Sequence, residues 1–137
     1  MSTTTIDRQA GGARTADPDE LGAQRYVRVI TFRRSGDAVV TPMICASDGR
    51  RLYVITRASS GKAKRLRNDP RVLVGASTGR GKPIGAEVGG AARILERDRG
   101  GKVDGLFARK YGLFWKVYDR FGRGRKADTV HVEIELD

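Results

Sequence analysis

The strongest chemical signal in the sequence is a basic, hydroxyl-rich segment that runs from Thr56 to Arg67. It starts where a predicted strand ends and a predicted helix begins. Backbone N–H groups at the start of a helix carry partial positive charge and attract anions. Hydroxyl, ammonium and guanidinium groups add hydrogen bonds that suit phosphate oxygens. The side chains that could contribute to a phosphate site are Thr56, Ser59, Ser60, Lys62, Arg65 and also Lys64. A solvated helix with a basic face explains the same residues about equally well.

A second segment of interest is Thr41-Pro42-Met43, which lies inside an apolar run that is predicted to be a strand. Proline lacks a backbone N–H, so within a strand it marks an edge, a bulge or a kink. The backbone groups that it leaves unpaired could face a planar ring. From these residues alone, a bulged edge strand is the favoured interpretation.

Residues for direct acid–base or nucleophilic catalysis are few. Cys45 lies in an apolar run and is expected to be a small core residue, because the single histidine, His131, is distant in sequence. His131 shares one face of the last predicted strand with Glu133 and Glu135, and we expect this face to be exposed to solvent. The sequence shows no catalytic pair and no metal-ligand cluster, so we expect a bound cofactor to carry any chemistry.

Composition narrows the class of protein. The chain has 137 residues and a formal net charge of +11, which predicts one domain and favours anionic partners such as nucleic acid, an acidic membrane surface or a phosphorylated ligand. One cysteine precludes an intrachain disulfide and fits a cytoplasmic protein. The sequence has no apolar run long enough to span a bilayer, so we expect no membrane partner.

Local patterns predict the elements that position these residues. Residues 1–21 are expected to form a disordered tail, in which Pro18–Arg25 could begin a helix capped by Asp17, and residues 22–137 to form the folded domain. β-Branched and apolar runs predict six strands: Tyr26–Arg33, Ala38–Ala46, Leu52–Thr56, Val72–Ser77, Glu87–Leu95 and Thr129–Leu136. Apolar residues at helical spacing predict helices over Lys62–Asn68 and Gly101–Phe121, and Gly112 could divide the second one.

The predicted order of elements, β-β-β-α-β-β-α-β, favours a small barrel. Tight turns join the first three strands into an antiparallel meander. A doubly wound nucleotide-binding sheet needs regular alternation of strands and helices, which is absent here. We therefore expect a mainly β fold with short helices, built as a six-stranded antiparallel split β-barrel.

Several stretches resemble one known family. They are Tyr-Val-Arg-Val-Ile-Thr-Phe-Arg-Arg-Ser-Gly-Asp from residue 26, Val-Val-Thr-Pro-Met from residue 39, Gly-Lys-Ala-Lys-Arg-Leu-Arg-Asn-Asp-Pro-Arg-Val from residue 61 and Arg-Lys-Tyr-Gly-Leu from residue 109. Together they resemble the pyridoxamine-phosphate-oxidase-like split-barrel family, and within it the actinobacterial flavin/deazaflavin-dependent oxidoreductases that use coenzyme F-420. The resemblance extends from Tyr26 to the C-terminus.

The resemblance implies a homodimer with the cofactor at the subunit interface. Thr41, Pro42 and Met43 would lie behind the ring system, and Thr56, Ser60, Lys62, Lys64 and Arg65 would hold its phosphate end. The implied activity is hydride transfer from reduced coenzyme F-420 to a conjugated small-molecule acceptor, with FMN as the alternative cofactor.

Two other functions stay open. The same fold could bind FMN or heme as a carrier without catalysis of its own. A basic nucleic-acid or membrane-surface module would use the clusters Lys62–Arg71 and Arg109–Lys126, with aromatic residues interleaved in the second. At helical spacing these aromatic residues are expected in the core or in a dimer contact, which disfavours nucleic acid as a partner.

Overall fold

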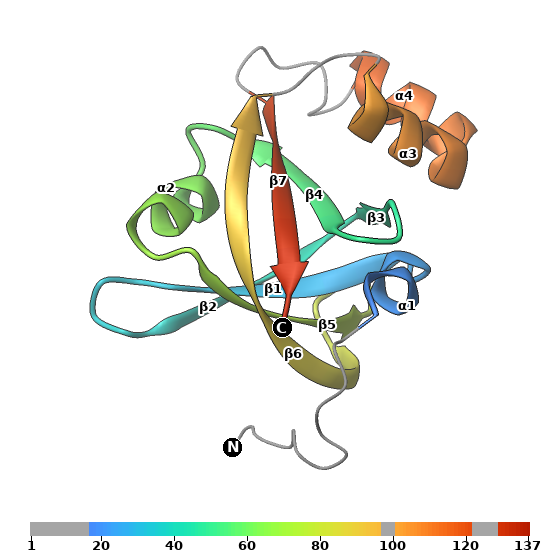
Figure 1. The fold of residues 1–137 in the computed structure, drawn as a ribbon. Helices are drawn as coiled ribbons and strands as arrows, with labels where there is room; N and C mark the ends of the chain where they lie inside the picture. The colour runs from blue at the N-terminus through green and yellow to red at the C-terminus, as the bar shows by residue number, and fades with distance from the viewer. Residues whose placement is uncertain (1–16, 97–100, 122–128) are drawn as a thin grey trace.

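The computed structural model describes residues 17–96, 101–121 and 129–137. The strands in these ranges form one seven-stranded antiparallel sheet in the order β2-β1-β5-β6-β7-β4-β3 (Figure 1). Their bounds are β1 (Tyr26–Phe32), β2 (Ala38–Met43), β3 (Cys45–Ser47), β4 (Leu52–Arg57), β5 (Arg71–Ser77), β6 (Pro83–Glu96) and β7 (Thr129–Leu136). The strands β2 and β3 lie at opposite edges of the sheet, yet only Ile44 separates them in sequence. The sheet must therefore curl until its two edges approach, which gives the expected split barrel.

The break at Ile44 accounts for the seventh strand. The sequence predicted one strand over Ala38–Ala46, but β2 pairs with β1 whereas β3 pairs with β4. The apolar pattern runs through the break, so the sequence does not reveal that the chain leaves one edge and joins the other. Pro42 lies in an edge strand, as its missing N–H predicted.

Two other elements differ from the prediction by more than one residue at one end. β6 begins at Pro83, so the end of the predicted loop Thr78–Gly85 belongs to the strand. α1 (Pro18–Gly22) is shorter than the predicted helix Pro18–Arg25. Asp17 caps α1 as expected, because its carboxylate accepts a hydrogen bond from the Asp19 N–H. Residues 1–16 of the predicted tail lie outside the described residues.

The interior of the barrel is apolar. Inward-facing side chains of all the long strands meet there, among them Val27, Leu52, Val74 and Ile134, each no more than 1 % exposed. The helix α2 (Gly61–Asn68) contacts β1, β4 and β6, and it inserts Leu66 into this core. The start of α2 is thereby fixed against the ends of strands that come from distant parts of the sequence.

A second apolar cluster lies on the outside of the barrel. The helices α3 (Lys102–Tyr111) and α4 (Leu113–Phe121) are separated at Gly112, which has a φ of 56° and ends α3 as the sequence suggested. Phe107 and Trp115 from these helices pack against Tyr53 and other residues of β3 and β4. Figure 1 shows the two helices lying together beside the β3–β4 side of the barrel. None of the helices in the described ranges combines the length and apolarity needed to cross a bilayer.

Candidate functional site

The junction between β4 and α2 brings two of the predicted phosphate-binding residues together. Thr56 lies near the end of β4, and its Oγ1 is 3.1 Å from Ser60 Oγ. Ser60 is the N-cap of α2, where its Oγ accepts a 3.1 Å hydrogen bond from the Ala63 N–H. The two hydroxyls therefore fix the direction in which the chain enters the helix, and a hydroxyl oxygen retains acceptor capacity for further bonds.

Arg65 lies across the start of α2. Its Nε donates a 2.7 Å hydrogen bond to Oγ1 of Thr31 on β1. Its Nη1 folds back over Gly61, where an added Cβ would lie 2.9 Å from it. Because any side chain at position 61 would fill this space, glycine leaves the guanidinium beside the first N–H groups of the helix. The predicted site therefore extends to Thr31, a residue that the sequence analysis did not include.

Thr31, Thr56, Ser60 and Arg65 form the site here called the Arg65 corner, and its electrostatics favour an anion. Burial, and then the positive charge of Arg33, lower the pKa of Arg65. No acidic side chain in the described ranges forms an ion pair with Arg33 or Arg65 within 4.0 Å. Two neighbouring guanidinium groups without a carboxylate repel each other, and an oxyanion between them would relieve that repulsion.

The structure places the two predicted lysines differently. Lys62 is half-buried and stands three residues before Arg65, which puts both on one flank of α2. Lys64 is exposed, so it adds positive charge near the helix start without sharing the enclosed corner. Arg33 was missed by the sequence analysis. The signal for it was the spacing Thr31-x-Arg33, because the predicted strand Tyr26–Arg33 would place alternate residues on one face.

Successive side chains of β2 point to opposite faces of the sheet, so Thr41, Pro42 and Met43 do not all lie on one face. Thr41 pairs with Val29 and Met43 with Val27, so both face the interior, and Met43 is only 8 % exposed. Pro42 pairs with Arg28 and faces outward, where its ring lies near Gly81. Thr41 and Met43 share the face of the β1–β2 pair that carries Thr31, and Thr41 is the nearer of the two because Thr31 pairs with Val39. That all three lie behind a cofactor ring stays a prediction.

Cys45 is a core residue, as the sequence predicted. It is fully buried, and burial raises the pKa of its thiol. Lys110 Nζ, 3.4 Å from the Cys45 Sγ, donates to the backbone oxygens of Cys45 and Gln24. A thiol that stays protonated at neutral pH is a poor nucleophile, so this arrangement ties α3 to the barrel and gives no sign of catalysis.

The prediction for His131 was wrong. The residue is 2 % exposed, and its Nε2 lies 2.9 Å from Oδ1 of Asp104, a buried carboxylate on α3. Strand alternation does place His131 on the face of Glu133 and Glu135, but α3 covers the His131 end of that face. The sequence could not show where this helix packs.

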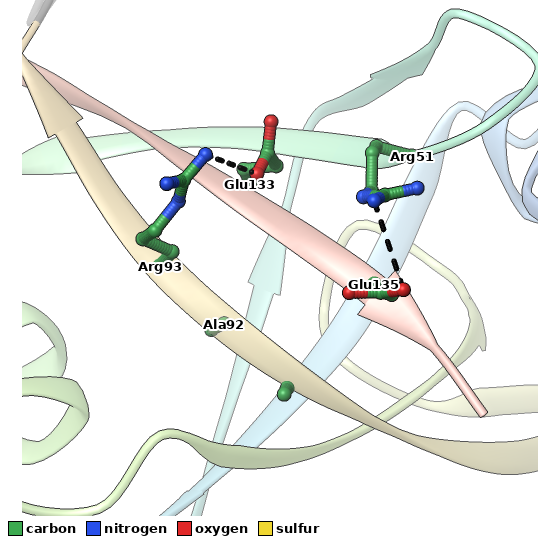
Figure 2. A pocket seen from close by; sticks show the side chains of 6 residues that line it. Arg51, Ala92, Arg93, Glu133 and Glu135 are labelled. Atoms are coloured by element: carbon green, nitrogen blue, oxygen red, sulfur yellow. Dashed lines mark hydrogen bonds and ion pairs between the residues drawn. The ribbon is translucent and has the colours of Figure 1, made fainter.

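A shallow hollow of about 360 Å³ lies on the outer face of β6 and β7 (Figure 2). Its charged side chains are already paired, Arg93 with Glu133 at 2.9 Å and Arg51 with Glu135 at 3.6 Å. Because each arginine there has a carboxylate neighbour, the hollow lacks the uncompensated charge of the Arg65 corner and is the weaker candidate for an anionic ligand.

The fold and this corner define a class of protein: a split barrel with an anion-attracting helix start beside its strand ends. The profile of the pyridoxamine 5'-phosphate oxidase family matches residues 18–131, and the chain belongs to this family. The resemblance inferred from the sequence motifs is thereby confirmed. Among curated protein sequences, none matches the chain significantly.

The solved structures with a similar fold are named for different ligands. An F420 reductase is 23 % identical with a TM-score of 0.61, over 87 % of this chain and 92 % of its own. The heme storage protein HutZ from Vibrio cholerae is 13 % identical with a TM-score of 0.64, over 87 % of each chain. An FAD-binding protein from Mesorhizobium loti is 22 % identical with a TM-score of 0.57, over 90 % of each chain. At these identities the likeness shows the fold alone.

Proposed function

We propose that this protein is an oxidoreductase that binds a phosphorylated flavin-type cofactor, coenzyme F-420, and reduces a conjugated small-molecule acceptor. The observation that carries the proposal is the position of Arg65, held on Thr31 and folded over Gly61 at the start of α2. The membership in the pyridoxamine 5'-phosphate oxidase family and the likeness to an F420 reductase support it.

The residues of the corner fit the phosphate end of such a cofactor. Arg65 and Lys62 would supply charge, Ser60 and Thr56 hydroxyl oxygens, and the helix start its backbone N–H groups. When bound, the deazaflavin supplies hydride transfer. The protein would fix the phosphate and hold the ring system beside β2 near Thr41. FMN is the alternative cofactor for the same residues.

A carrier of heme is less well supported by the residue chemistry. The single histidine of the chain, His131, is buried and bonded to Asp104, and Cys45 is buried in the core. Neither side chain could reach an iron without opening the structure. The oxidoreductase proposal therefore takes precedence over this second function.

We also propose that the protein is a homodimer with the cofactor at the interface. The outer faces of β1, β5 and β6 carry charges of both signs, such as the ion pair of Arg28 with Glu87 at 2.9 Å. They also expose Ile84, at 62 %. A twofold interface presents the same surface from both copies, so a surface with balanced charges suits it better than a uniformly basic one.

The test is a fluorescence titration of the purified protein with coenzyme F-420 and, in parallel, with FMN. We expect Arg65→Gln to weaken cofactor binding by about 1–3 kcal/mol, the scale of a charge-assisted hydrogen bond. The matched control is Arg67→Gln, since Arg67 lies on the same helix but bonds the Ala58 carbonyl instead. Equal affinities for wild type, Arg65→Gln and Arg67→Gln would remove the phosphate site from this corner.

A further inference from the structure

Helix α4 exposes three large apolar side chains. Leu113 is 76 % exposed, Phe114 50 % and Val117 52 %. Residues 113 and 117 are one helical turn apart, and residue 114 is their neighbour, so the three form one continuous strip, here called the α4 strip. The Phe114 ring has Tyr111 and Tyr118 as neighbours, with ring centroids 5.8 and 6.4 Å away, yet half of it stays exposed. Exposed apolar side chains gathered in this way mark an interaction surface.

The opposite side of α4 is held firmly. Trp115 is 5 % exposed and stacks on Phe107 and on Tyr118, with ring centroids 5.2 and 5.3 Å away. Both partners belong to the second apolar cluster on the barrel. From their helical spacing, the aromatic residues of this helix were expected in the core or in a dimer contact. The structure confirms the core assignment for Trp115 and leaves Phe114 half outside.

Positive charge borders the α4 strip. Lys116 and Arg120 are exposed, and both follow residues of the strip by three positions, which places them along one side of it. Asp119 is the single acidic residue in the sequence of α4. The whole chain carries a net charge of +11. The strip therefore combines apolar side chains with a cationic border, the pattern of a helix that lies in the surface of an anionic membrane.

A second copy of the chain fits this surface less well. An isologous contact through α4 would bring the cationic borders of two copies together, and like charges across an interface are unfavourable. The outer face of β5 and β6, with its balanced charges, lies on strands that do not contact α4 to any appreciable extent. A dimer formed through those strands would leave the α4 strip available.

We propose that the α4 strip docks the protein on the surface of a bilayer that contains anionic lipid. Leu113, Phe114 and Val117 would enter the boundary between headgroups and acyl chains, and Lys116 and Arg120 would lie against the lipid phosphates. The barrel would remain in water. The proposal departs from the sequence-based expectation of no membrane partner, which rested on the lack of an apolar run long enough to span a bilayer; contact with the bilayer surface needs no such run. This proposal is independent of the cofactor, because none of its residues belongs to the Arg65 corner.

The test is co-sedimentation of the full chain with vesicles of phosphatidylcholine and with vesicles that also contain phosphatidylglycerol. We expect binding to the anionic vesicles, weakened by salt. The variant Leu113→Ser/Phe114→Ser/Val117→Ser should bind at least tenfold more weakly, and Lys116→Gln about fivefold more weakly. Val40→Ser is the matched control, since Val40 is also an exposed apolar residue, at 42 %, but lies on β2; its binding should equal that of wild type.

Two further readouts separate the possible occupants. In a Phe114→Trp variant, brominated acyl chains should quench tryptophan fluorescence more than in wild type, whose one tryptophan is Trp115. Equal quenching in the two proteins would show that the strip does not enter the bilayer. Light scattering should give the triple-serine variant the same mass as wild type. The proposal would be overturned if the triple-serine variant bound anionic vesicles as well as wild type does. It would also be overturned if the variant changed oligomeric state, or if it lost binding to duplex DNA and kept binding to vesicles.

Discussion

Arg65 on α2 and Thr31 on β1 are joined by a 2.7 Å hydrogen bond from Nε to Oγ1, although 34 positions separate them in sequence. Thr31 is 1 % exposed, so the strand presents one rigid acceptor to a side chain that is otherwise long and flexible. This bond decides where the charge of Arg65 lies. A flexible arginine on a solvated helix would attract phosphate weakly, because much of its conformational freedom would be lost on binding.

Thr31→Val should test this positioning directly. Valine keeps the shape of threonine and its preference for a strand but removes the acceptor for Arg65. We expect cofactor affinity to fall by about 0.5–1.5 kcal/mol, the net value of one hydrogen bond, with a smaller change in the free energy of unfolding. In a double-mutant cycle, Arg65→Gln should cost less in the Thr31→Val background than in wild type. Fully additive effects would show that Thr31 does not position Arg65.

Ser60→Ala should affect both stability and binding. Its Oγ caps α2 through the Ala63 N–H and lies 3.1 Å from Thr56 Oγ1. Loss of an N-cap of this type costs about 1 kcal/mol of unfolding free energy, which urea denaturation would measure. Ser60→Thr keeps the oxygen and is the control. If Ser60→Ala is as stable as wild type, the cap seen here does not contribute to the fold.

The sequence predicted the strands and the start of α2 because both leave local patterns. Alternating apolar residues identify β7, and the hydroxyl residues before Gly61 identify the start of α2. The break at Ile44 leaves no such pattern, because the residues on both sides of it are apolar. It depends on which edge of the sheet each half joins.

The long-range contacts of Arg65 and His131 could not be predicted from the sequence for the same reason. Thr31 and Arg65 come together only through the closure of the barrel. The regular alternation of its strand predicts that His131 is exposed, and only the packing of α3 against that strand buries it. Periodicity reports which residues share a face, whereas burial depends on which distant element covers the face.

His131→Ala should destabilise the fold strongly. The His131 and Asp104 side chains are 3 % and 7 % exposed, and removal of the imidazole would leave a buried carboxylate without this partner. Breaking a buried pair of this kind costs about 3–5 kcal/mol. Thermal unfolding should show the loss, whereas Glu135→Gln, which breaks an exposed pair with Arg51, should change stability by less than about 0.5 kcal/mol. A His131→Ala variant as stable as wild type would contradict a structural role for the pair.

Tyr53 should make the protein lose stability in alkali. Its Oη lies 3.2 Å from Asp48 Oδ2 and 3.3 Å from Glu133 Oε2. Burial, followed by the charges of Asp48 and then Glu133, raises its pKa from 10.0 to about 12. Between these values the unfolded chain loses the phenolic proton while the folded chain keeps it. The folded state therefore binds more protons, and stability falls as the pH rises through this range.

The measurement is the free energy of unfolding in urea at several pH values from 8 to 11. Lys110 opposes the trend, since burial lowers its pKa and the unfolded chain then binds the extra proton, so the comparison has to be made between variants. We expect Tyr53→Phe to decline less steeply than wild type above about pH 10, because phenylalanine has no proton to lose. Absorbance of tyrosinate at alkaline pH would check the assignment independently. Parallel decline of the two proteins would show that Tyr53 titrates alike in the folded and unfolded chains.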